Sequence, residues 1–207
     1  MKPGYFLFLA AVVIQAAWSV GFARAAEESS IAAAITFGTT CARCHEGECS
    51  GRLSFDLGIE ASTNHLVRHA GPLTKSSIRE LFAMLEYMKR ECSYPPFDIP
   101  IPPDGIWSSS ALAELCRPLR RSYFIPIGAL GAGPHSLELE FGNEPHVHAE
   151  VVTWTFDLLV DEPLEIVNGR ATVELRTTEP SQAFLRLVAR ESIELDRLTL
   201  DAKDESH

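Results

Sequence analysis

Leu137-Glu138-Leu139-Glu140-Phe141 is the stretch that decides how the C-terminal part of this 207-residue chain folds. Its apolar and acidic residues alternate, which is the period of a β-strand with one buried face. Asn168-Gly169 is the pair that a two-residue type I′ hairpin turn prefers. Further strands are predicted over residues 147–160, 171–175, 184–189 and 193–200. From about Tyr123 onward we therefore expect a small antiparallel β-sandwich-like domain, residues 122–207.

A proline-rich segment precedes this domain. Pro95-Pro96-Phe97-Asp98-Ile99-Pro100-Ile101-Pro102-Pro103-Asp104-Gly105 is predicted to be an extended linker, because each proline fixes φ and lacks an amide donor. Residues 108–115 then predict a short capped helix that stops near Pro118. The linker and the short helix, residues 95–121, separate the β-rich domain from the segment before them.

Two helical patterns lie before the linker. Residues 30–37 are alanine-rich and predict one helix. Thr74-Lys75-Ser76-Ser77 supplies capping hydroxyls for a second helix. Its apolar residues recur at helical spacing, at Ile78, Leu81, Phe82, Leu85 and Met88. Residues 26–94 therefore predict a small all-α domain, and the predicted fold class is α+β, with this domain followed by the β-domain.

Cys41-Ala42-Arg43-Cys44-His45 follows the first helix and has the spacing of a covalent haem attachment site. Two thiols two residues apart reach the two vinyl groups of one porphyrin, and the next residue lies under the iron. A thioredoxin-like motif would follow a strand instead of a helix, and a zinc site would need a second pair of ligands. The sequence therefore predicts one haem c, bound through Cys41 and Cys44, with His45 as an iron ligand.

With this motif, residues 30–92 resemble the class I monohaem cytochromes c. In that family, a small residue and an aromatic residue on the first helix cross an apolar residue and a tyrosine on the last helix. Ala33 and Phe37 match the first pair, and Met84 and Tyr87 match the second. The resemblance implies that Phe37 and Tyr87 pack against the haem or between the helices.

The sixth iron ligand departs from the family pattern. Class I cytochromes usually supply a methionine before the last helix, but no methionine lies between His45 and Met84. His65 and His69 lie in this stretch, one helical turn apart. We therefore expect a bis-histidine iron with His69 or His65 opposite His45, which lowers the reduction potential. Met84 and Met88 are expected in the core of the last helix.

The loop after the motif and the remaining cysteines add further expectations. Arg52 is a candidate partner for a haem propionate. Cys49, Cys92 and Cys116 remain after the haem takes two of the five cysteines, which predicts one disulfide and one thiol. Both Cys49–Cys92 and Cys92–Cys116 are compatible with the sequence.

The N-terminus and the net charge indicate where the protein works. Residues 1–25 have a basic start, an apolar middle and the small-x-small ending Ala23-Arg24-Ala25, which predicts a cleaved signal peptide and a periplasmic or extracellular protein. Retention of this segment as a membrane anchor is the alternative. The net charge of −10 excludes a basic nucleic-acid-binding surface and favours encounter with a basic partner.

These observations predict an exported electron-transfer protein that docks to a redox partner or complex through its β-domain and is not an enzyme. A haem sensor or a small peroxidase-like enzyme with an open iron is the alternative, and a structural role of the β-domain is a third. His146-Val147-His148 places two imidazoles on one side of a strand, as at the start of a copper or zinc site, but the sequence shows no third ligand.

Overall fold

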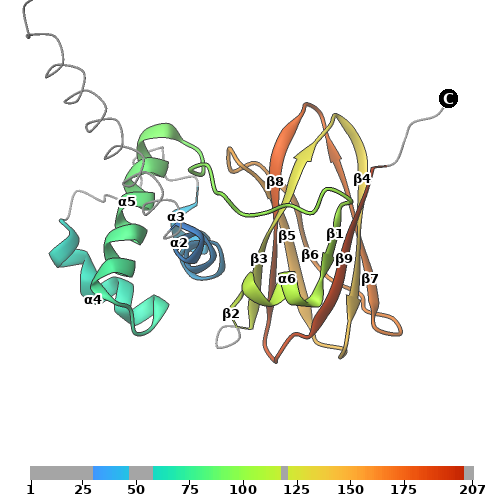
Figure 1. Cartoon of the computed structure of the whole chain (residues 1–207), viewed down its shortest axis with the longest axis horizontal. Helices are drawn as coiled ribbons and strands as arrows, with labels where there is room; N and C mark the ends of the chain where they lie inside the picture. Colours follow the sequence, from blue (N-terminus) through green and yellow to red (C-terminus); the bar gives the residue numbers. More distant parts are fainter. Residues whose placement is uncertain (1–29, 47–57, 118–120, 203–207) are drawn as a thin grey trace, which may run out of the picture.

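The computed structural model describes residues 30–46, 58–117 and 121–202. Their nine strands form two antiparallel sheets that pack face to face (Figure 1). The four-stranded sheet has the order β1 (Ile106–Ser108), β9 (Leu195–Ala202), β4 (Gly133–Phe141) and β7 (Arg170–Thr177). The five-stranded sheet has the order β2 (Cys116–Arg117), β3 (Ser122–Leu130), β8 (Ser181–Ala189), β5 (Val147–Thr153) and β6 (Leu158–Pro163).

Alternating sequence builds the layer between the two sheets. Leu137 and Leu139 of β4 are buried, while Glu138 between them is exposed. On the facing sheet, Val151 and Leu185 are fully buried in the same apolar cluster. The predicted strands over 171–175 and 184–189 are confirmed within β7 and β8, most of 193–200 lies in β9, and the region predicted over 147–160 divides into β5 and β6 around a turn. The Asn168-Gly169 turn is confirmed, since both residues have positive φ and Val167 and Arg170 exchange two backbone hydrogen bonds.

Five of the described helical segments gather on one side of the sandwich (Figure 1). In chain order they are α2 (Ser30–Thr36), the π-helix η1 (Phe37–Cys41), α3 (Ala42–His45), α4 (Ile59–Ala70) and α5 (Lys75–Glu91). A short helix, α6 (Ser109–Glu114), lies apart from them against β1 and β9. The predicted cap of α5 is present, because the amide of Ser77 donates to the Thr74 hydroxyl at 3.1 Å. None of the described helices is both long enough and apolar enough to cross a membrane.

A second apolar layer lies between these helices and the outer face of the five-stranded sheet. It joins Phe37, Leu81 and Met88 of the helices to Phe124 and Phe184 of strands β3 and β8. The rings of Phe124 and Phe184 stack with centroids 5.0 Å apart. Strand β3 is therefore buried on both faces over most of its length, by the other sheet and by the helices.

This shared layer corrects the predicted fold class. The chain is mostly β, with two antiparallel sheets, and it is not a small all-α domain followed by a β-domain. Helical periodicity showed that each helix has an apolar face, but it did not show what that face packs against. α2 and η1 pack on the sheet, α5 packs on α2, and the apolar residues of these helices form one continuous cluster with Phe124, Val152 and Phe184 of the sheet.

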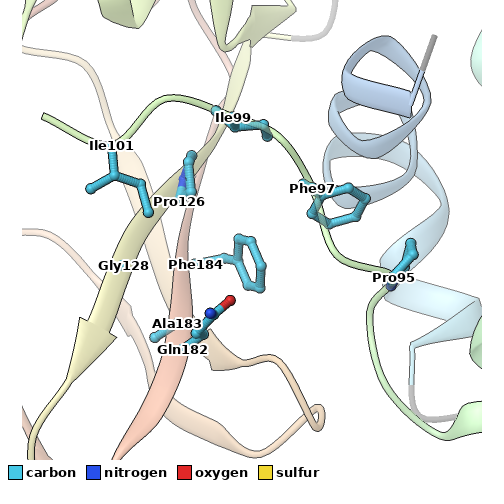
Figure 2. Close-up of a pocket in the computed structure, with 9 residues that line it drawn as sticks. All are labelled: Pro95, Phe97, Ile99, Ile101, Pro126, Gly128, Gln182, Ala183 and Phe184. Carbon is cyan, nitrogen blue, oxygen red and sulfur yellow. The ribbon is translucent and has the colours of Figure 1, made fainter. Parts of the chain in front are cut away.

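The segment predicted to be a linker runs along the boundary between the helices and the five-stranded sheet. Residues 95–101 are extended, and the segment that follows contributes β1 and β2 to the two sheets. Figure 2 shows the pocket that residues 95–101 form over β3 and β8, where Phe97 faces Phe184. Their ring centroids are 5.9 Å apart. The free space in this pocket is about 30 Å³, roughly that of one water molecule, so the pocket is a packing joint and not a ligand site.

Candidate cofactor site

The Cys41-x-x-Cys44-His45 motif lies on a distorted helical turn. The π-helix η1 ends at Cys41, which is buried, and α3 carries Cys44 and His45 on the next turn. Cys44 is exposed and His45 is half-buried, so both face the rim of the helical layer. Neither cysteine is in a disulfide. Short π-helical insertions of this kind are frequent at functional sites.

Gly38 lets this turn approach the sheet closely. A Cβ atom at this position would overlap the ring of Phe124 on β3. The hydroxyl of Thr39 donates to the carbonyl of Ile35 at 2.6 Å, a bond to the preceding helical turn that threonine commonly makes. The motif is therefore seated directly on the sandwich, one turn after its point of closest approach.

Three histidine rings meet beside the motif. His65 and His69 are one turn apart on α4, next to the buried Leu66 and Ala70. The ring centroids of His45 and His65 are 5.9 Å apart with planes at 84°, and those of His65 and His69 are 4.5 Å apart. Partial burial, followed by the charges of His69 and His45, lowers the pKa of His65, which favours the neutral imidazole that binds a metal.

The residue types gathered here are those that would hold a haem c. The rings of His45 and His65 lie close enough that small side-chain rotations would let one metal ion reach both imidazoles. The buried hydroxyl of Thr40, next to Cys41, has no hydrogen-bond partner among the described residues. Cys41, Cys44 and His45 would hold the group from one side, and α4 would supply the second imidazole.

An arginine of the sandwich anchors the motif. Arg186 on β8 is buried, and its Nη2 lies 2.6 Å from a carboxylate oxygen of Glu46, the residue directly after His45. Its Nη1 donates to Glu150 on β5. The hydroxyl of Tyr94 donates to the same oxygen of Glu46. A buried ion network therefore fixes the end of α3 to the five-stranded sheet.

This network has strongly shifted protonation equilibria. Burial, followed by the negative charge of Glu46, holds the pKa of Tyr94 well above its usual range. Burial alone would lower the pKa of Arg186, but the charge of Glu46 and the other acidic groups beside it raises it. Tyr94 therefore remains a neutral donor and Arg186 a cation.

A second arginine supports the helix that carries the histidines. Nη2 of Arg117, on the short strand β2, donates to the carbonyl of Ala70 at 3.0 Å. Ala70 is the last residue of α4, where helix carbonyls lack intrahelical partners. Both halves of the histidine cluster are thus tied to the sandwich, α3 through Arg186 and α4 through Arg117.

The structure places the other candidate residues as follows. Phe37 is fully buried, in edge-to-face contact with Tyr94 at 5.9 Å. Tyr87 is half-buried with the guanidinium of Arg90 over its ring. Ala33, Met84 and Met88 lie in the layer between helices and sheet. Arg52 lies outside the described residues.

The predicted disulfide is settled in part. Cys92 is disulfide-bonded and Cys116 is a reduced thiol, which excludes the Cys92–Cys116 pair. Cys49 lies outside the described residues. Burial raises the pKa of the Cys116 thiol, so it is a poor nucleophile at neutral pH.

The sequence analysis missed the anchors Glu46, Tyr94, Arg117 and Arg186. Arg186 carried one signal, because a lone cation interrupts the apolar run Ala183-Phe184-Leu185 and Leu187-Val188 of a predicted strand. Charged residues are almost never fully buried without a partner, so such a residue predicts a buried ion pair. Its partners, however, come from distant parts of the chain.

Comparison with known proteins gives only weak similarities. No family model matches the chain, and no curated protein is similar to it. One similar solved structure is BtGH115A, a family GH115 4-O-methyl-α-glucuronidase with specificity for decorated arabinogalactans, at 12% identity over 70% of this chain and 24% of that one, with a TM-score of 0.34. Another is CBM35 from Cellvibrio japonicus Abf62, at 16% identity over 39% of this chain and 63% of that one, with a TM-score of 0.27. The chain spans less than two thirds of either protein.

The comparisons correct the predicted family and function. The two similar structures named above come from carbohydrate-related proteins and neither is a cytochrome, and no family model or curated protein matches the chain. The resemblance to class I cytochromes c is therefore wrong, and the predicted electron-transfer function, together with its sensor and peroxidase-like alternatives, is withdrawn. The resemblance rested on a five-residue motif and on two pairs of residues, one pair on each of two helices. In the structure, the apolar cluster of these helices also includes residues of a β-sandwich.

Proposed function

We propose that this chain is a haem-binding protein that holds one haem c through Cys41 and Cys44, with His45 and His65 as iron ligands. The observation that carries the proposal is the pair of imidazole rings 5.9 Å apart, one of them on the C-x-x-C-H turn. His69 flanks His65 at the rim of the site. When bound, the haem supplies an iron atom whose properties are tuned by its two axial ligands.

The environment of the motif supports this proposal. The site needs its two ligand-bearing segments at a fixed separation, and Arg186 and Arg117 hold these segments on one rigid sandwich. The disulfide at Cys92 is typical of an exported protein, and export is part of the proposal. The absence of enzymatic activity and the protein partner remain predictions.

The test is covalent attachment. The full chain is produced in a bacterium that makes and attaches haem c, and haem absorbance is measured on the denatured chain. We expect one haem per chain, one thioether fewer in Cys41→Ala or Cys44→Ala, and no retained haem in the double variant. Cys116→Ala is the matched control, because this reduced cysteine lies outside the site and should leave the haem in place. A wild-type chain that carries no haem after denaturation rules the proposal out.

The same protein tests the second ligand. Replacing His65 by Ala should convert a low-spin iron to a high-spin one, whereas His69→Ala should leave it low-spin. The reverse result would keep the haem but move the ligand to His69. An iron whose spin state neither substitution changes would exclude both histidines.

A further inference from the structure

A second group of metal-binding side chains lies on strands β5 and β6. One ring nitrogen of His148 and one carboxylate oxygen each of Glu150 and Asp161 lie within 4.8 Å of one another. We propose that these three side chains bind one divalent transition-metal ion, and specifically zinc. This site goes beyond the haem proposal and does not depend on it.

The register of the sheet brings the three residues together. Glu150 on β5 lies directly opposite Asp161 on β6, and His148 is opposite Pro163. His148 and Asp161 are therefore diagonal neighbours on one face of the sheet, within reach of each other's side chains. His148 Nε2 lies 2.5 Å from an Asp161 oxygen, which already brings two ligand atoms to one point.

The charge balance around these residues favours a cation. Glu150 and Asp161 are like charges on directly opposed positions, an arrangement that destabilises a strand pair unless it is compensated. Among the described residues, Arg186 pairs with both Glu150 and Glu46, while Asp161 pairs with His148. Arg186 is the permanent cation of this network, and a divalent ion held by His148 and Asp161 would add positive charge beside the three carboxylates.

The donor atoms and their exposure select the class of metal. Imidazole with carboxylates suits zinc and its neighbours in the transition series, whereas calcium and magnesium prefer oxygen ligands alone. Glu150 is 16% exposed, and the side chains of His148 and Asp161 are 39% and 55% exposed. An ion can enter from solvent, and ligand atoms about 3 to 4 Å apart in such a site need only small rotations of exposed side chains.

His146 provides a matched control two residues away. Its ring lies 3.0 Å from Glu191 and is 93% exposed, and it is not part of the three-residue group. The sequence pattern placed both histidines on one side of a strand, but in the structure their side chains contact different residues. His146 pairs with a single carboxylate, while His148 gains the additional ligands that the sequence did not reveal.

The experiment is zinc titration of the full chain by isothermal calorimetry, with Zn²⁺ as the only added ligand. We expect one zinc per chain at this site, bound at least tenfold more weakly in His148→Ala and in Asp161→Asn, and unchanged in His146→Ala. Crystals soaked with zinc should show an anomalous peak between the three side chains. The haem content of these variants should equal that of the wild type, so failure of the zinc site leaves the haem proposal standing.

Three results would contradict the zinc site. Wild-type zinc binding in His148→Ala would place any bound zinc elsewhere, for example at Cys44, and would overturn the proposal. An equal loss in His146→Ala would indicate only a nonspecific ion on exposed histidines. Calcium or magnesium binding with the same affinity would show an oxygen-ligand site and exclude the class of metal proposed here.

Discussion

The two buried layers of this protein are built differently. Strand β8 contributes to both, because Leu185 and Leu187 point between the sheets, while Phe184 and Arg186 lie on the outer face under the helices. The layer between the sheets is an apolar cluster. The layer under the helices adds Arg186 and its partners Glu46, Glu150 and Tyr94. Apolar burial suffices to join the sheets, whereas directional bonds fix where the Cys-His turn sits.

Removing Arg186 should break the second layer most severely. In Arg186→Met, the carboxylates of Glu46 and Glu150, each only 16% exposed, lose their buried counterion. Breaking a buried ion pair from one side costs about 3–5 kcal/mol. We expect this loss in the free energy of unfolding by urea denaturation, together with a lower yield of covalently attached haem, because Glu46 directly follows His45.

Arg170→Met is the control for this effect. Arg170 pairs with Glu140 at 3.1 Å on the surface, where the two side chains are 75% and 43% exposed. Such pairs contribute about 0–1 kcal/mol. If both variants lose the same small amount of stability, the polar network does not anchor the helices, and the difference drawn between the two layers is wrong.

A smaller effect is expected from Gly38→Ala, which tests the close approach of the Cys-His turn. The added Cβ would overlap the ring of Phe124, and overpacking of this kind costs about 1–3 kcal/mol. Thermal unfolding should report this loss. Since η1 leads directly into Cys41, the yield of covalent haem should fall as well.

Gly131→Ala is the matched control, since nothing lies within 4 Å of a Cβ at that position and its φ is not positive. It should leave stability unchanged or slightly raised, because alanine restricts the unfolded chain. Equal stability of the two alanine variants would mean that the turn does not need its contact with Phe124.

The layer between the sheets was largely readable from the sequence. Alternation in Leu137-Glu138-Leu139-Glu140-Phe141 and the Asn168-Gly169 pair both report local geometry, which the backbone imposes within a few residues. The layer under the helices was not readable in the same way. The apolar face of α5 shows that it packs on something, but nothing local indicates that it belongs to one apolar cluster with Phe124 and Phe184 of the sheet.

The candidate sites divide along the same line. Cys41, Cys44 and His45 are adjacent in sequence, so their motif was visible, and His65 and His69 were found as the imidazoles of one short stretch. Glu46 and Arg186 are 140 positions apart, and their pairing depends on the packing of α3 against β8. His148 and Asp161 meet through strand register, which the sequence did not determine.

Each buried layer contains one tyrosine that should lower the stability of the folded protein at alkaline pH, Tyr94 under the helices and Tyr123 between the sheets. Burial and the charge of Glu46 hold the pKa of Tyr94 well above its ordinary value near 10. Above pH 10 the unfolded chain therefore loses this proton while the folded chain keeps it. The folded state then binds more protons than the unfolded state, so stability falls as pH rises, by about 1.4 kcal/mol per pH unit for one such group.

Tyr94→Phe should remove this contribution and flatten the decline in stability above pH 10, although it lowers stability at neutral pH by about 1.5–3 kcal/mol through loss of the hydrogen bond to Glu46. Urea unfolding at a series of pH values from 8 to about 11 measures both effects. Tyr123 is the comparison residue, because burial and nearby Cys116 raise its pKa to about 12 without any contact with Arg186. Tyr123→Phe should flatten the same alkaline decline and leave the yield of covalently attached haem unchanged, whereas Tyr94→Phe should flatten the decline and lower that yield. Equal haem yields in the two variants would show that the hydrogen bond from Tyr94 to Glu46 does not hold the Cys-His turn in place.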